Sequence, residues 1–184
     1  MKYMLSIIRK ENIVHILRQT LSMVNPRLIS HGERVSYIVL KMLQYEGKHS
    51  LPEILNRCML AVVHDIGAYK IEEIDRMVKF ETESVWDHSI YGYLFVKNLT
   101  PLEGYADALL FHHLPWKDFD KVTCKNRSLA AMLHLADRID LYHEAGVLIP
   151  EGAFFAPCRD TSFSGEQIDL FLEAEQKLQI LSRL

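Results

Sequence analysis

The sequence lacks the features of membrane-spanning and secreted proteins. It contains no uncharged apolar run approaching the roughly 18 residues that a membrane-spanning helix requires. Charged residues at 9–11 interrupt the region where a signal peptide would need its apolar core. The cysteines Cys58, Cys124 and Cys158 are few and widely spaced, which is typical of reduced thiols rather than of a disulfide framework or a zinc ribbon. These absences predict a cytoplasmic protein.

The chain also lacks an excess of charge of either sign. Lys and Arg total 21 and Asp and Glu total 24, which gives a net charge of −3, and no block of like charges occurs. This balance gives no indication of a nucleic-acid-binding or membrane-binding surface. A chain of 184 residues is long enough for one compact domain, and we expect a single domain over residues 1–184.

Strand-like alternation is missing too, and apolar residues recur at helical spacing almost throughout. We therefore predict an all-α fold, a single compact bundle of about seven helices. The first carries Val14, Leu17, Leu21 and Val24 and ends at Asn25-Pro26. The second is predicted from about Ser30 to Gly47, and the third from the capping signature Ser50-Leu51-Pro52-Glu53 to Gly67. The fourth is predicted over 84–99, and the fifth runs from Pro101 to His113, where Pro115 blocks further helix. The last two are predicted over 126–143 and around 168–178, with an ordered loop at 146–165 between them.

Several His and Asp residues fall on the predicted buried faces of these helices. His31 lies four residues before Val35, on the inward face of its helix. Asp65 lies seven residues after Cys58, which is two helical turns along the buried face of the third helix, with His64 beside it. Polar groups at such positions require partners.

Three further helices repeat this pattern. His88 belongs to the apolar series of the fourth helix, His112 and His113 can both turn inward at the end of the fifth, and Asp137 follows Leu133 by four residues. Any one such residue is more often a satisfied core residue than a ligand, so the interpretation depends on their joint placement. A shared metal centre would remove the cost of burying them.

In their order along the chain, these residues resemble the H…HD…D pattern of the HD superfamily, whose members are helical, metal-dependent and mostly phosphohydrolases. The chain is most similar to the HD-GYP subfamily over about residues 28–172. The matching elements are His31 with Arg34-Val35, His64-Asp65-Ile66-Gly67, His88 followed by Gly92, the doublet His112-His113, Asp137, and Ser164-Gly165 with Ile168-Asp169.

The resemblance implies hydrolysis of a phosphodiester, cyclic di-GMP in that subfamily, by a water that two metal ions activate for attack on phosphorus. The implied ions are iron or manganese, with zinc, cobalt or nickel as alternatives. Asp65 would bridge them. Arg34 and Lys70 are candidates for phosphate contact, with an ordinary ion pair on a helix surface as the alternative, which is favoured for Lys70. The implied metal ligands are His31, His64, Asp65, His88, His112, His113 and Asp137.

The sequence departs from the subfamily pattern in three places. The lysine of the subfamily's HDxGK motif falls on Ala68, although Lys70 follows two residues later. Residues 114–116 read Leu-Pro-Trp where the subfamily has a glutamate and then the Gly-Tyr-Pro loop. Arg27 replaces a glutamate that holds a third metal in trinuclear members. Because of Arg27 we expect two metals and not three. The substrate class that the resemblance and the complete ligand set imply is a nucleotide or a cyclic dinucleotide.

Three functions remain open. The leading one is a phosphodiesterase or phosphatase acting on a small phosphorylated substrate, and a homodimer is compatible with it. Ala68 and the missing loop would favour a regulatory module that binds without turnover, and a di-iron oxygenase is the third reading. Asp140 and His143, beyond Asp137 on the same helix, either support the ligands or are solvated. His15, His49 and His134 match no motif, and we expect structural or surface roles for them.

Overall fold

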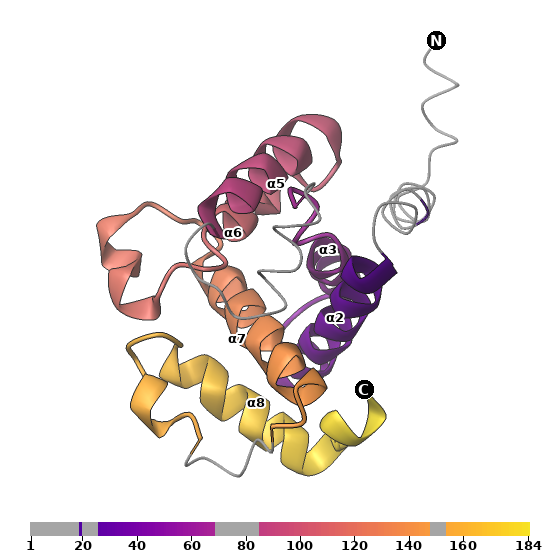
Figure 1. Ribbon diagram of the computed structural model, residues 1–184, viewed down its shortest axis with the longest axis vertical. Helices are drawn as coiled ribbons and strands as arrows, with labels where there is room; N and C mark the ends of the chain where they lie inside the picture. The colour runs from indigo at the N-terminus through magenta and orange to yellow at the C-terminus, as the bar shows by residue number, and fades with distance from the viewer. Residues whose placement is uncertain (1–18, 20–25, 69–84, 148–153) are drawn as a thin grey trace.

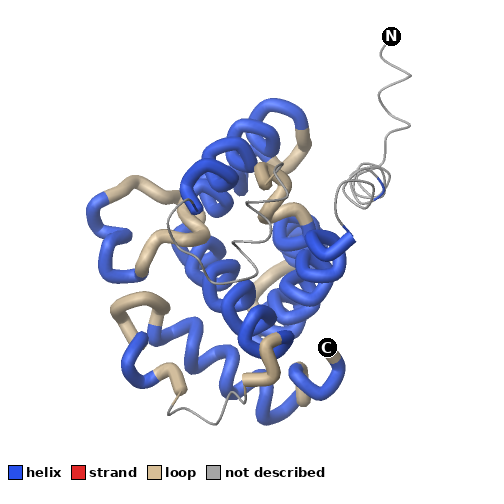
Figure 2. The backbone as a smooth tube through the Cα atoms, in the orientation of Figure 1, coloured by secondary structure: helices blue, strands red, loops and turns tan. Residues whose placement is uncertain are grey.

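The computed structural model describes residue 19 and residues 26–68, 85–147 and 154–184, and it confirms the predicted all-α class. Figure 2 shows helices and loops and no strand in the described residues. Among these residues, extended pairing is limited to one isolated bridge between Arg159 and Phe163. None of the described helices combines the length and the apolar character needed to cross a bilayer. The α-helices are α2 (Pro26–Glu46), α3 (Leu51–Val62), α5 (Val85–Leu99), α6 (Ala106–Leu110), α7 (Arg127–Glu144) and α8 (Gly165–Leu178).

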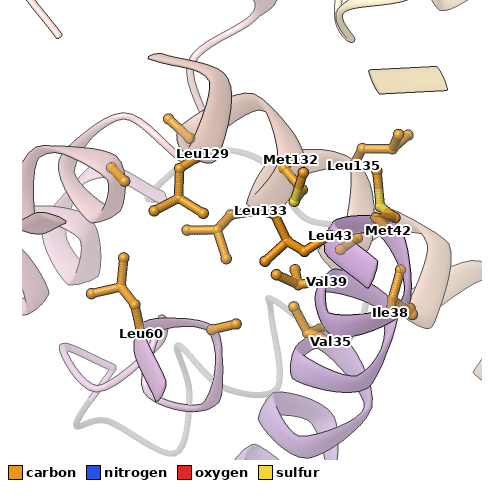
Figure 3. Packing of buried hydrophobic residues seen from close by; sticks show 14 of the residues in the cluster. Val35, Ile38, Val39, Met42, Leu43, Leu60, Leu129, Met132, Leu133 and Leu135 are labelled. Atoms are coloured by element: carbon orange, nitrogen blue, oxygen red, sulfur yellow. The ribbon is translucent and has the colours of Figure 1, made fainter. Parts of the chain in front are cut away.

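Helix α7 lies at the centre of the fold and packs against α2, α6 and α8 (Figure 1). Its buried apolar face meets that of α2, with Leu60 of α3 nearby (Figure 3). Each such side chain contributes roughly 1.5–3 kcal/mol when it leaves water completely. Fully or almost fully buried residues of this core cluster include Val35, Ile38, Val39, Met42, Leu43, Leu129, Met132, Leu133 and Leu135.

Helix α3 begins as its capping signature predicts. The backbone N–H of Ser50 donates a hydrogen bond to Oε2 of Glu53 at 2.9 Å, and the Ser50 hydroxyl donates to the same oxygen at 2.7 Å. The glutamate thus engages a group that precedes the helix. The predictions for α5, α7 and α8 also agree with the observed bounds to within a few residues.

Some predicted boundaries were wrong. Helix α3 ends at Val62 rather than at Gly67, because the backbone leaves the helical region at Val63 (φ −110°, ψ 18°) and continues as turns. His64 and Asp65 therefore lie in the turn after the helix, not on a helical face. Sequence periodicity missed this end because the turn residues are buried like those of a helix.

Two other helices also differ from the predicted bounds. Helix α2 begins at Pro26 rather than near Ser30, since proline is well suited to the first turn of a helix. The predicted fifth helix is shorter: a 3-10 helix at Glu103–Tyr105 leads into α6, which ends before the His112-His113 pair. That pair lies in the following turn.

Three more short 3-10 helices lie outside the predicted elements, at Trp116–Lys121, Ala156–Cys158 and Leu181–Arg183. The first of them directly follows Pro115, so this proline does not block helical backbone as predicted, because it precedes the first turn and no helical N–H is required of it. The first predicted helix and Lys70 lie outside the described residues.

Candidate metal centre

The fold brings all the sequence-predicted ligands together around Asp65. The nitrogen and oxygen donor atoms of His31, His64 and Asp65 lie within 4.8 Å of one another. The donor atoms of Asp65, His88, His112 and His113 form a second group by the same measure, so Asp65 belongs to both. The predicted ligands come from α2 (His31), the turn after α3 (His64, Asp65), α5 (His88), the turn after α6 (His112, His113) and α7 (Asp137).

The two oxygens of Asp65 face different sets of imidazoles. Oδ2 lies 3.2 Å from Nε2 of His64 and 3.7 Å from Nε2 of His31. Oδ1 lies 3.6 Å from Nε2 of His88 and also 3.6 Å from Nε2 of His112. One carboxylate thus stands between two groups of nitrogen donors, which is the arrangement required of a residue that bridges two metal ions.

Asp137 completes the first of these groups. Its Oδ1 lies 3.0 Å from Nε2 of His31 and 3.9 Å from Nε2 of His64. Its Oδ2 lies 4.0 Å from Nδ1 of His113 and 3.7 Å from Nε of Arg138. Asp137 is 3% exposed, so this carboxylate depends on the groups around it rather than on water.

Backbone carbonyls orient two of the imidazoles. Nδ1 of His64 lies 2.8 Å from the carbonyl oxygen of Ala61, and Nδ1 of His112 lies 2.5 Å from that of Leu109. A carbonyl only accepts, so each Nδ1 carries the proton and donates it. The lone pair of each ring is then on Nε2, the atom that faces Asp65. In metal sites, a hydrogen bond of this kind fixes the tautomer and the orientation of a histidine that binds the metal through its other nitrogen.

A carboxylate orients His31 in the same manner. Nδ1 of His31 donates to Oδ2 of Asp140 at 2.7 Å, and Arg34 binds both oxygens of Asp140, through Nε at 2.6 Å and Nη2 at 2.9 Å. Nη2 of Arg34 also lies 2.5 Å from Oε1 of Glu144. The structure therefore gives Arg34, a predicted phosphate contact, two carboxylate partners behind the centre. Asp140 is fully buried and is one of the residues that could support the ligands.

Both carboxylates of the centre are held ionised. Burial alone would raise the pKa of Asp65, but the adjacent His64 and other imidazoles hold it well below its usual range. Burial opposes ionisation of Asp137 as well, and the hydrogen bond with His31 and the charge of Arg138 lower its pKa. Burial lowers the pKa of His31, but hydrogen bonds with Asp137 and Asp140 outweigh it and raise this pKa to about 10.

In the second group of imidazoles the pKa values of His88 and His113 are lowered, because the effect of burial exceeds the attraction of the nearby carboxylates. Burial lowers the pKa of His88 to about 4. Burial and the neighbouring His112 also hold the pKa of His113 well below its usual range. Nε2 of His88 and Nε2 of His113 lie 2.9 Å apart, a contact that two neutral rings can make as donor and acceptor. Neutral imidazole is the form that binds metal.

Several nitrogen and oxygen atoms that could bind a metal at the centre are buried without a hydrogen-bond partner. Each such atom costs about 1–3 kcal/mol, and so many in one place would be unusual in a folded protein. Imidazole nitrogens combined with carboxylate oxygens suit divalent transition metals, so the residues fit such ions. The unpaired atoms are Nε2 of His64, both carboxylate oxygens of Asp65, Nε2 of His112, Nδ1 of His113 and Oδ2 of Asp137.

His134, His49 and His143 are the described histidines outside the predicted ligand set. His134 is buried, its ring centroid lies 4.9 Å from that of Phe163, and burial lowers its pKa to about 3. His49 pairs with Glu46 at 3.0 Å, and His143 is partly exposed on α7. His15 lies outside the described residues.

Sequence reasoning missed Arg138, whose guanidinium lies beside Asp137. Consecutive residues of a helix point in different directions, so Arg138 gave no periodic signal of belonging to the same site. Its position directly after a predicted ligand was the available indication.

The chain is similar in sequence to a bacterial phosphodiesterase. The chain is 30% identical over 119 residues to the 3'3'-cGAMP-specific phosphodiesterase 1 of Vibrio cholerae. The matched region covers 63% of this chain and 27% of the relative, so the chain corresponds to about a quarter of that protein's length. No model of a known protein family matches the sequence, and no solved structure matches it.

Proposed function

We propose that the chain is an HD-type, metal-dependent phosphohydrolase that cleaves a phosphodiester bond in a nucleotide or a cyclic dinucleotide. The observation that carries the proposal is Asp65, whose two oxygens each face a separate set of imidazole nitrogens. The similarity to a 3'3'-cGAMP-specific phosphodiesterase supports a cyclic dinucleotide, either 3'3'-cGAMP or cyclic di-GMP, as the substrate class.

In this proposal the centre holds two divalent ions, iron or manganese in the first place. His31, His64 and Asp137 would hold one ion, and His88, His112 and His113 would hold the other, with Asp65 shared between them. When bound, the pair of ions supplies Lewis-acid charge and an activated water for attack on phosphorus.

The chain's own residues determine how this centre attracts and binds its substrate. Only Asp65 and Asp137 bring negative charge to the ligand set, which is too little to neutralise two divalent ions, so positive charge remains for a phosphate. Burial of the ligands keeps bulk water away and strengthens that attraction. Lys70 stays a predicted phosphate contact.

The test compares matched aspartate variants of the protein loaded with Mn(II) or Fe(II). Wild type should hydrolyse 3'3'-cGAMP or a general phosphodiester such as bis(p-nitrophenyl) phosphate. Asp65→Asn should abolish turnover, because it removes charge from the shared carboxylate. Asp120→Asn is the control, since Asp120 is 83% exposed in an ion pair with Arg127. Wild type that is fully metal-loaded yet releases no product would contradict the proposal.

The two other readings give different results in the same experiment. Nucleotide binding in a calorimeter without any product would favour the regulatory module, for which Ala68 and residues 114–116 are the motivation. Oxygen consumption coupled to an organic substrate would favour the di-iron oxygenase.

A further inference from the structure

Arg138 is the described lysine or arginine that lies closest to the ligand carboxylates. Its Nε is 3.7 Å from Oδ2 of Asp137, which is longer than a hydrogen bond. The side chain of Arg138 is 15% exposed, whereas that of Asp137 is 5% exposed. The guanidinium therefore lies largely buried beside the centre, nearer to solvent than the carboxylate it faces.

Arg34, the other arginine near the centre, already pairs with two carboxylates of the protein. It binds both oxygens of Asp140 and one oxygen of Glu144. These contacts occupy the face of the guanidinium that could otherwise hold a phosphate in a two-point contact. Arg34 therefore acts on the centre through Asp140 and His31.

No such partner engages Arg138 among the residues that the structure describes. The carboxylate that faces it belongs to Asp137, which is itself a predicted metal ligand. His134, one helical turn before it, is buried, and an imidazole carries no negative charge that could pair with the guanidinium. Because 15% of the Arg138 side chain is exposed, its guanidinium can exchange water for an anion that enters the centre.

We propose that Arg138 binds the phosphate group of the substrate at this centre. The inference rests on the proposed function and names the side chain that holds the anion. The planar guanidinium offers several N–H donors to non-bridging phosphate oxygens, and the contact is charge-assisted. Asp137 would then contact a metal ion through one oxygen and lie beside the phosphate-binding arginine with the other.

The test uses Arg138→Gln, with Arg183→Gln as control because Arg183 is exposed in the C-terminal 3-10 helix. The metal content of each Mn(II)-loaded protein is measured first, and inorganic phosphate is then titrated by calorimetry. Arg138→Gln should keep its metal and raise the Kd for phosphate by on the order of tenfold to a hundredfold, as expected for loss of a charge-assisted hydrogen bond. The KM for bis(p-nitrophenyl) phosphate should rise similarly, and Arg138→Lys should restore part of both.

Unchanged phosphate affinity in Arg138→Gln would overturn the inference, and so would loss of metal, which would show that Arg138 only holds Asp137 in place. If circular dichroism shows that the glutamine variant does not fold, Arg138→Met decides by the same phosphate titration, because it keeps the apolar stem. Wild type that binds metal and phosphate but hydrolyses nothing would contradict the proposed function alone. The comparison of phosphate affinities would then still decide the role of Arg138.

Discussion

Nδ1 of His31 and Oδ2 of Asp140 lie 2.7 Å apart although the two residues are 109 positions apart in the sequence. This hydrogen bond joins α2 to α7 and turns Nε2 of His31 toward Asp137, 3.0 Å away. Arg34 donates hydrogen bonds to both oxygens of the same carboxylate. The orientation of a predicted ligand is therefore fixed by a pair of residues that themselves lie outside the ligand set.

Replacing Asp140 by Asn should weaken metal binding while leaving the ligands in place. The amide keeps the size of the side chain but loses the charge that balances both His31 and Arg34. Loss of such a supporting group typically costs about 10–100-fold in metal affinity. Competition with a coloured chelator measures this affinity, with Asp120→Asn as the matched control. Equal affinity in both variants would show that Asp140 does not support the centre.

Gly67 should tolerate no larger side chain, because a Cβ there would lie 2.0 Å from the carbonyl oxygen of His88 and 2.7 Å from the backbone nitrogen of Gly92. Gly67→Ala should lower the free energy of unfolding by about 1–3 kcal/mol, the usual cost of overpacking. Gly104→Ala is the control, since a Cβ at Gly104 would meet no atom within 4 Å. Urea denaturation measures both, and equal midpoints would contradict the close contact between this turn and α5.

Two cysteines should be slow to alkylate. Burial raises the pKa of Cys58 to about 11, and burial together with the nearby Asp107 raises that of Cys124 to about 12. Because the thiolate is the reactive form, a raised pKa keeps each thiol protonated through pH 9. Their rates with iodoacetamide should still be rising above pH 10, where an ordinary cysteine, with a pKa of about 8.5, has levelled off. Peptide mapping checks this, with urea-unfolded protein as control; a plateau near pH 9 would contradict it.

The sequence predicted the helices whose apolar faces are long and regular. Helix α7 was predicted within one residue at each end, because its buried positions recur over many turns. The end of α3 was predicted wrongly, because the residues after Val62 are buried at helix-like intervals although their backbone forms turns. Periodicity reports burial, and it cannot separate a buried turn from a buried helix.

The clustering of the predicted ligands could be anticipated because each of these residues faces the interior, and burial leaves a signal in the sequence. The partners of the arginines were not predictable in this way. Whether Arg34 meets a phosphate or Asp140 depends on how α2 packs against α7, and nothing local to Arg34 encodes that. Arg138 was missed because it follows Asp137 directly and so lies off the periodic series that marks the buried face of α7.

The central claim is that residues from five parts of the fold form one centre for two metal ions that share Asp65. Metal content after anaerobic loading with Mn(II) or Fe(II), measured by inductively coupled plasma mass spectrometry, tests it most directly. The account predicts about two ions per chain in wild type and in Asp120→Asn, and a loss of at least one ion in Asp65→Asn. A wild-type chain that retains no ion, or an Asp65→Asn chain that retains both, would contradict it.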